Sequence, residues 1–206
     1  MNNQWNRLVY KGWAPVYDHF FNKGPFAKAR KNVFQSLSFQ KGQKVLFVGV
    51  GTGADLDYIP VEDLDITAID YSPEMLERAR QRFSHASITY NVMDAQQLEL
   101  ASDSFDYVIA SLIVSVVPDS ERAFAEMQRV VKPGGQIIIF DKFAKRGERL
   151  SIGKKLIRPV VGLLGTDIGV SFENLFKGQR NNLELLEDKD VIFRGMYRRI
   201  LLRKNR

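Results

Sequence analysis

Short apolar runs alternate with longer amphipathic stretches through the middle of the chain, and this alternation limits the fold more than any other feature. Apolar runs of this length suit strands that are buried on both faces of a sheet. Because strands separated by helices pair in parallel through right-handed crossovers, we expect a doubly wound α/β fold covered by helices on both faces. The expected strands are Val45–Val48, Ile66–Ile69, Ala86–Tyr90, Tyr107–Leu112 and Gln136–Phe140.

Two helices and a closing hairpin complete the pattern. Ser72 and Pro73 form an N-cap and first-turn pair, which predicts that a helix begins there. Its apolar residues Met75, Leu76 and Ala79 share one face. A second helix is expected at Ser120–Val131, and the hairpin pairs Val191–Phe193 with Arg199–Leu202. The five strands and the two strands of the hairpin together predict a mostly parallel, seven-stranded sheet.

Composition excludes several classes of protein. A chain of 206 residues is the length of one domain. The absence of Cys excludes disulfides, thiolate zinc sites and thiol nucleophiles, so we expect no metal site and a reducing compartment. No apolar run approaches the roughly 20 residues that a membrane span needs, and residues 1–10 do not resemble a signal sequence. We expect a cytoplasmic protein that is at most peripheral to a membrane.

Charge is distributed unevenly along the chain. Residues 1–44 hold eight basic and one acidic side chain, and residues 142–160 hold seven and one, whereas residues 45–141 hold six basic and sixteen acidic. Basic flanks around an acidic middle favour an anionic partner, either a nucleic acid or an anionic membrane surface. Ordinary solubilising charge is the alternative.

Two basic, amphipathic segments fall outside the alternation, and they determine the expected domain organisation. Such segments are typical of interfacial membrane helices or of lids over a site, and equally of helices packed on their own sheet. We expect residues 1–40 to form an N-terminal helical lid or membrane-facing segment, residues 41–206 to form the main domain, and residues 142–187 to be a basic, partly helical insertion within it. The apolar faces hold Trp5, Leu8, Val9 and Trp13 in the first segment, and Ile152, Leu156, Val160, Leu163 and Leu164 in the second.

A glycine loop carries the clearest functional pattern. Gly49-Val50-Gly51-Thr52-Gly53 directly follows the first expected strand, where glycine permits a tight turn and close approach of a ligand. Asp70 ends the second strand, where its carboxylate can accept the hydroxyls of a ribose. A plain β–α turn is the alternative for the glycines alone. The G-x-G-x-G spacing suits a nucleoside with a short charged tail better than a dinucleotide.

Five ordered motifs resemble those of class I S-adenosylmethionine-dependent methyltransferases. They cover about the middle half of the chain: Val45–Gly53, Ile69–Leu76, Met93–Ala95, Phe105–Val108 and Arg129–Gly135. The resemblance implies a Rossmann-like methyltransferase fold with N-terminal helices as a lid. It also implies S-adenosyl-L-methionine as cofactor and S-adenosyl-L-homocysteine as product.

The same resemblance implies the role of each cofactor-binding residue. The glycines of the loop line the methionine end, Asp70 binds the ribose, and Tyr71 and Met75 border the adenine. Asp94 accepts from the adenine amino group, and Ala95 offers a backbone donor. The full set is Tyr17, Val48, Gly49, Gly51, Thr52, Gly53, Asp70, Tyr71, Met75, Met93, Asp94, Ala95 and Ser111. Phe47 departs from the pattern, because the family usually has an acidic residue there that helps hold the amino group of the cofactor.

The outer segments are similar to those of the short bacterial phospholipid N-methyltransferases. This resemblance rests on Tyr10–Asp18, the glycine loop, Val116–Pro118, Leu156–Pro159 and Ser171-Phe172. It implies a peripheral enzyme on the inner face of the membrane that methylates phosphatidylethanolamine, in up to three steps, to phosphatidylcholine. The implied partners are a phospholipid or other apolar acceptor and an anionic membrane surface.

Methyl transfer to an amine places modest demands on the protein. A neutral amine is already a good nucleophile, so the site mainly supplies alignment and excludes water. The ammonium headgroup must first lose a proton, and Tyr17, Asp18, His19 and Asp141 are the polar candidates near the expected mouth. We take Tyr17, as a lid residue, and Asp141 as the catalytic candidates. Core packing is the alternative for Tyr17, and a helix cap or solvated charge for Asp141.

Three other functions can be weighed from the sequence. A nucleic-acid methyltransferase fits the basic flanks, but Ser111-Leu112-Ile113-Val114 stands where adenine-methylating enzymes have a polar residue and Pro-Pro-aromatic, and cytosine C5 chemistry needs a Cys. We therefore expect no nucleic-acid partner. The apolar residues 112–117 suit a lipid or a quinone acceptor, so a quinone or other small-molecule methyltransferase is the second candidate. A cofactor-binding protein without turnover is the third.

Overall fold

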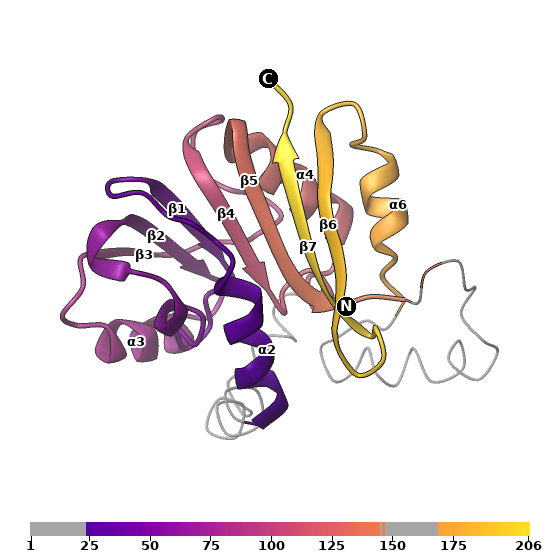
Figure 1. The fold of residues 1–206 in the computed structure, drawn as a ribbon. Coiled ribbons are helices and arrows are strands. Elements are labelled where there is room, and N and C mark those ends of the chain that lie inside the picture. The colour runs from indigo at the N-terminus through magenta and orange to yellow at the C-terminus, as the bar shows by residue number, and fades with distance from the viewer. Residues whose placement is uncertain (1–23, 145, 147–168) are drawn as a thin grey trace.

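The computed structural model describes residues 24–144, 146 and 169–206 of the chain. Its described strands form one seven-stranded sheet with the order β3-β2-β1-β4-β5-β7-β6 (Figure 1). This confirms the doubly wound, mostly parallel α/β sheet that the alternation predicts. The strands are β1 Lys44–Val48, β2 Asp65–Asp70, β3 Ile88–Val92, β4 Phe105–Ser111, β5 Val131–Lys142, β6 Leu183–Ile192 and β7 Tyr197–Lys204.

Parallel pairing holds the first five strands, and an antiparallel hairpin closes the sheet. β1 pairs with β2 and β4, β2 with β3, and β4 with β5, all in parallel. β7 pairs antiparallel with both β5 and β6. The helices are α2 Gly24–Phe34, α3 Pro73–Arg82, α4 Ser120–Val130 and α6 Phe172–Lys177, with short 3-10 helices η1 at Leu56–Tyr58 and η2 at Val61–Asp63.

Helices cover both faces of the sheet, as continuous apolar strands require. One face packs under α4 and α6, where Phe124 and Phe172 meet alternate residues of the central strands. The other face packs under α2, η1 and α3, where Phe34, Leu56 and Leu76 meet the remaining residues of the same strands (Figure 1). The two buried layers fix the central strands, and with them the loops that follow those strands.

The carboxyl ends of β1, β2 and β4 meet at one edge of the sheet. The chain runs outward from β1 to β3 and then returns to β4 on the other side of β1, so the strand order reverses between β1 and β4. Ligands of open α/β sheets bind in the crevice outside such a switch point. Gly49, Tyr71 and Leu112 directly follow these three strands and therefore lie at this carboxyl edge.

Several expected strand boundaries differ from the structure. The third strand occupies Ile88–Val92, two residues later than expected. β5 begins at Val131 because Val131 pairs with Phe105 before a register shift, although Pro133 and the glycines after it are typical of a turn. The largest difference concerns the start of β6, which also determines where the expected insertion ends.

The insertion does not extend to residue 187 as we expected, because β6 begins at Leu183. β6 is an edge strand with a largely charged and half-exposed sequence, and such residues protect a free sheet edge against pairing with other chains. A search for apolar runs therefore finds only its last residues. Phe193, expected within the strand, lies in the turn that follows.

The described part of residues 1–40 is packed into the domain. Ala29, Val33 and Phe34 of α2 are buried on the sheet. The expected amphipathic segments around Trp5–Trp13 and Ile152–Leu164, and the lid residue Tyr17, lie outside the described residues. Within the described ranges, every helix is too short or too polar to cross a bilayer.

Candidate functional site

The glycine loop after β1 has a backbone that other residues rarely adopt. Gly49, Gly51 and Gly53 have φ values of 72°, 57° and 82°, a left-handed conformation that is costly for residues with a Cβ. A Cβ on Gly49 would lie 2.8 Å from Cδ1 of Ile113, and one on Gly53 would lie 3.0 Å from Cε2 of Phe83. At Gly51, in contrast, no heavy atom of the described residues beyond the adjacent ones lies within 4 Å of that position. The loop is thus packed at both ends and open in the middle.

Asp70 is fixed beside this opening by backbone donors. Its Oδ2 accepts a hydrogen bond from the Gly51 N–H at 2.9 Å, and its Oδ1 accepts one from the Ser72 N–H at 2.9 Å. Burial raises the pKa of the Asp70 carboxyl, and the hydrogen bonds from Ser72, Gly51 and Tyr71 oppose that rise. A carboxylate offers about four acceptor positions, so the Asp70 carboxylate keeps acceptor capacity for a ribose hydroxyl.

The loop after β3 lies next to Asp70. The Met93 N–H donates to the Asp70 carbonyl at 3.0 Å, which joins this loop to the end of β2. The Asp94 carboxylate accepts from the Gln96 N–H at 2.9 Å. Ala95 is buried, and among the described residues its N–H has no acceptor. A buried N–H without an acceptor is rare in folded proteins, and a ring nitrogen of a bound base would satisfy it.

The loop after β4 begins with a strained residue. Ser111 ends the strand, and Leu112 then adopts a φ of 57°, which is unusual for a bulky side chain. The Leu112 N–H donates to the Phe140 carbonyl at 2.8 Å, which holds the unusual turn in place. Ile113, the next residue, lies against Gly49. The loops after β1 and β4 therefore contact each other at the strand-order switch point.

A buried carboxylate fixes the same β4 loop from the other side. The Asp141 Oδ1 accepts from the Ser115 hydroxyl at 2.7 Å and from the Lys142 N–H at 2.7 Å, and its Oδ2 accepts from the Ser115 N–H at 3.1 Å. Asp141 is 0% exposed. Burial raises the pKa of Asp141, although the hydrogen bonds from Ser115 oppose that rise. Burial, with the nearby Asp141 carboxyl, also raises the pKa of Tyr197 to about 12.

The remaining expected site residues differ in what they can offer a ligand. Val48 and Met75 are buried, and Val48 belongs to the apolar core, so its backbone alone is available. Thr52 is also buried, whereas Tyr71 is 39% exposed at the carboxyl edge. Phe47, the departure from the family pattern, is 1% exposed and packs in the α2 face of the core. An acidic side chain at this position would be surrounded by apolar groups.

One buried ion pair next to the loop was not expected from the sequence. Arg30 of α2 donates to Asp55, which follows the glycine loop, and both side chains are almost fully buried. The pair joins α2 to the loop from a separation of 25 residues. The one local indication of this ion pair is that Asp55 lies two residues after Gly53. That position does not identify Arg30 as the partner.

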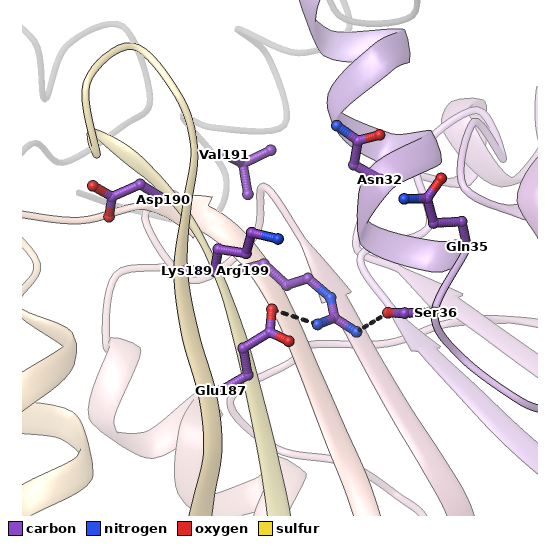
Figure 2. A pocket seen from close by; sticks show the side chains of 8 residues that line it. All are labelled: Asn32, Gln35, Ser36, Glu187, Lys189, Asp190, Val191 and Arg199. Atoms are coloured by element: carbon purple, nitrogen blue, oxygen red, sulfur yellow. Dashed lines mark hydrogen bonds and ion pairs between the residues drawn. The ribbon is translucent and has the colours of Figure 1, made fainter.

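A polar pocket of about 250 Å³ lies elsewhere, between α2 and the β6–β7 hairpin (Figure 2). At its centre, the guanidinium of Arg199 donates to the Ser36 hydroxyl at 2.9 Å and pairs with Glu187 at 2.6 Å. None of the expected site residues in the described ranges lines this pocket. It is separate from the crevice formed by the glycine loop, Asp70 and the β4 loop.

Comparison with known proteins decides the family. The model of a methyltransferase domain family matches residues 46–139, which include the glycine loop, Asp70 and the loop after β4. A phosphatidylethanolamine N-methyltransferase from Cereibacter sphaeroides is 33% identical over 192 residues, covering 91% of this chain and 92% of that protein. The chain belongs to the class I S-adenosylmethionine-dependent methyltransferases. Its methyl donor is S-adenosylmethionine.

Other members of this family differ in the acceptor that their names give. A demethylmenaquinone methyltransferase from Renibacterium salmoninarum is 34% identical over 129 residues, covering 61% of this chain and 54% of that protein. A Haemonchus contortus N-methyltransferase, solved with phosphomonomethylethanolamine and S-adenosylhomocysteine, has a TM-score of 0.69 at 24% identity. That likeness covers 86% of this chain and 43% of the other. The fold is thus shared by enzymes with several acceptors.

The described residues of this methyltransferase fit its cofactor. The open space at Gly51 leaves room for a ligand close to the backbone, and the two Asp70 oxygens beside it suit ribose hydroxyls. The N–H of Ala95 suits a base acceptor. These features lie along the carboxyl edge from β1 to β3, in the order that the motifs predict.

Proposed function

We propose that the chain N-methylates the phosphatidylethanolamine headgroup toward phosphatidylcholine. The observation that carries this proposal is the extent of similarity to the Cereibacter sphaeroides enzyme, which spans 92% of that protein rather than the methyltransferase core alone. The apolar loop after β4 is consistent with a lipid acceptor, because Leu112, Ile113 and Val114 replace the polar side chains that a nucleobase would need.

The chain contributes to the reaction mainly by positioning. When bound, S-adenosylmethionine supplies an electrophilic methyl group on a sulfonium. The glycine loop and Asp70 hold the donor through backbone approach and hydrogen bonds, and the buried α4 and α2 layers keep that frame rigid. The β4 loop excludes water from the place where the amine approaches. Once the headgroup amine has lost its proton it is a good nucleophile, so alignment and exclusion of water contribute most to its methylation.

In this proposal, Asp141 acts through the β4 loop. Both its oxygens accept hydrogen bonds, two of them from Ser115, and the side chain has no exposed surface. A proton from the headgroup has no direct route to such a carboxylate, since a general base must reach the proton that it takes. We therefore assign Asp141 a positioning role and Tyr17 the role of a lid residue above the cofactor. The basic N-terminal and 142–160 segments contribute attraction to the anionic inner face of the membrane.

A lipid analysis tests the proposed acceptor. The protein is expressed in a bacterium whose membrane contains phosphatidylethanolamine but no phosphatidylcholine, and headgroups are separated by mass. We expect mono-, di- or trimethylated phosphatidylethanolamine in cells with the wild-type chain and much less with Asp70→Ala. Cofactor binding by the purified wild-type protein, without any methylated headgroup in the cells, would reject the proposal.

A quinone is the second candidate acceptor. It is favoured by the 34% identity with a demethylmenaquinone methyltransferase, although that similarity covers only 54% of that protein. The apolar loop after β4 suits a quinone as well as a lipid. The same cells distinguish the two, because a quinone acceptor places the added methyl group on the neutral lipid fraction. Cofactor binding without methylation of either fraction would indicate a protein without turnover.

A further inference from the structure

The turn between β6 and β7, residues Phe193–Met196, projects at the carboxyl edge of the sheet, and we call it the hairpin tip. Tyr197, the first residue of β7, pairs in register with Lys142 at the end of β5. The Phe143 N–H donates to the Met196 carbonyl at 2.9 Å and fixes the tip to the chain that leaves β5. Figure 1 shows this turn at the same edge as the start of α2. The tip therefore lies on the side of the molecule where the methyl-transfer crevice opens.

Two large apolar side chains are exposed within the four residues of the tip. Phe193 is 55% exposed and Met196 is 46% exposed. Single apolar residues on a protein surface need no explanation, but two such residues on a projecting turn form a local apolar contact surface. The two exposed side chains therefore offer an apolar contact to a partner at this edge of the molecule.

The tip holds its side chains in a costly but fixed backbone conformation. Phe193, Arg194 and Gly195 have φ values of 54°, 53° and 83°, and the first two are not glycine. Strain of this kind persists where the surroundings enforce it, and it concentrates at sites of function. The Phe193 ring packs edge-on against Phe26 of α2 at a centroid distance of 5.9 Å and lies 5.8 Å from the Tyr197 ring. Exposed aromatic surface is thus presented rigidly.

Positive charge accompanies this apolar surface. Arg194 is exposed between the two apolar residues. Lys142, the last residue of β5, is the register partner of Tyr197, which directly follows the tip. Apolar side chains flanked by Lys and Arg match the boundary of an anionic bilayer, where rings enter the acyl region and cations meet lipid phosphates.

We propose that the hairpin tip inserts Phe193 and Met196 into an anionic membrane surface and so orients the crevice toward the bilayer. This inference rests on the proposed lipid acceptor. It adds that the hairpin tip brings the methyl-transfer crevice to the membrane that holds this acceptor. A second copy of this chain could also cover the tip, and the experiments below distinguish that case from membrane insertion.

The absence of Cys allows the tip to be probed directly. Met196→Cys receives an environment-sensitive dye, and Leu185→Cys, at a 39% exposed residue near the other end of β6, is the matched control. Vesicles contain phosphatidylcholine and phosphatidylglycerol without phosphatidylethanolamine, so insertion is measured independently of the acceptor. We expect a blue shift, and quenching by spin-labelled acyl chains, for the dye at residue 196 alone.

A sedimentation experiment with the same vesicles supplies the second readout. Phe193→Ser/Met196→Ser should weaken co-sedimentation about tenfold, with S-adenosylhomocysteine affinity unchanged, and Leu185→Ser should leave both unchanged. An unshifted dye at residue 196 on vesicle-bound protein would overturn the proposal. A dye shift that depends on protein concentration without vesicles would instead show self-association and overturn it too. Tip insertion without lipid methylation would reject the proposed function and leave the tip assignment intact.

Discussion

The Ser115 hydroxyl donates to the Asp141 carboxylate across 2.7 Å, and this bond ties the loop after β4 to the end of β5. Asp141 has no exposed surface and Ser115 is almost fully buried, so the bond forms away from bulk water. Hydrogen bonds to a charged group in such surroundings are stronger than neutral ones. Since the loop that Ser115 holds also contains Ile113, which contacts Gly49, the pair controls the shape of the crevice from the side of β4.

Ser115→Ala should lower kcat more than it changes the affinity for the cofactor. The substitution leaves an Asp141 oxygen with one donor fewer and loosens the β4 loop, whereas Asp70 and the glycine loop keep their contacts. We expect a loss of about 1 to 3 kcal/mol in transition-state stabilisation. Steady-state kinetics with calorimetry of S-adenosylhomocysteine separates the two effects. An equal loss in cofactor affinity would instead show that Ser115 supports the whole site.

Asp70→Ala should weaken cofactor binding by about 1 to 3 kcal/mol, because ribose hydroxyls lose their acceptor. The Gly51 and Ser72 N–H groups also lose theirs, so thermal unfolding must be measured beside calorimetry. Asp70→Asn is the matched variant, since it keeps an acceptor oxygen and the same volume. An unchanged dissociation constant for S-adenosylhomocysteine in Asp70→Ala would reject the ribose assignment.

Gly49→Ala should disturb the site more than Gly42→Ala. Both glycines have positive φ, 72° and 81°, so both substitutions strain the backbone. At Gly49 the new Cβ also collides with Ile113, whereas at Gly42 it meets no atom within 4 Å in the part of the chain that the structure describes. We expect Gly42→Ala to cost about 1 kcal/mol of folding free energy and Gly49→Ala about 1 to 3 kcal/mol more. Denaturant unfolding checks both values.

The collision between a Cβ at Gly49 and the Ile113 side chain can be relieved by shortening Ile113. Gly49→Ala should also weaken cofactor binding, because the collision moves the glycine loop, and in Gly49→Ala/Ile113→Ala the side chain that meets the new Cβ is shortened, so part of that affinity should return. A double-mutant cycle with calorimetry measures the coupling, which should exceed about 0.5 kcal/mol. Strictly additive effects would mean that the contact between the two loops does not shape the site.

Asp188→Asn should reduce stability at neutral pH and have little effect in acid. Burial raises the pKa of Asp188, but hydrogen bonds from Arg198 and Arg146 outweigh it, and the folded-state pKa lies below the ordinary 3.8. A lowered folded pKa stabilises the protein above the unfolded pKa, and this stabilisation is lost as pH falls through the folded pKa. The difference in unfolding free energy between wild type and Asp188→Asn should therefore shrink below pH 3.8. A constant difference would contradict the ion pair.

Local sequence patterns were sufficient for the frame of this site. Continuous apolar runs predict β1, β2 and β4 because strands buried on both faces need them. The Ser72 cap is confirmed by the hydrogen bond from the Met75 N–H to the Ser72 hydroxyl at 3.2 Å. Caps and buried strands are determined by neighbouring residues, so they can be predicted without the fold.

Contacts between distant segments could not be predicted from local sequence patterns. Arg30 pairs with Asp55, and Ser115 with Asp141, across 25 and 26 residues, and no local pattern selects those partners. The first part of β6 was missed for a different reason, because an edge strand protects itself with charge and loses the apolar pattern. The sequence therefore predicts where the cofactor lies better than what fixes the loops around it.

The most direct test of the account is transfer of labelled methyl from S-adenosylmethionine by the purified protein to vesicles that contain phosphatidylethanolamine. The account predicts label in mono-, di- or trimethylated headgroups with the wild-type chain and a reduced amount of that label with Asp70→Ala at limiting cofactor. Label confined to an added demethylmenaquinone, or no label in any lipid from a protein that binds S-adenosylhomocysteine, would contradict it.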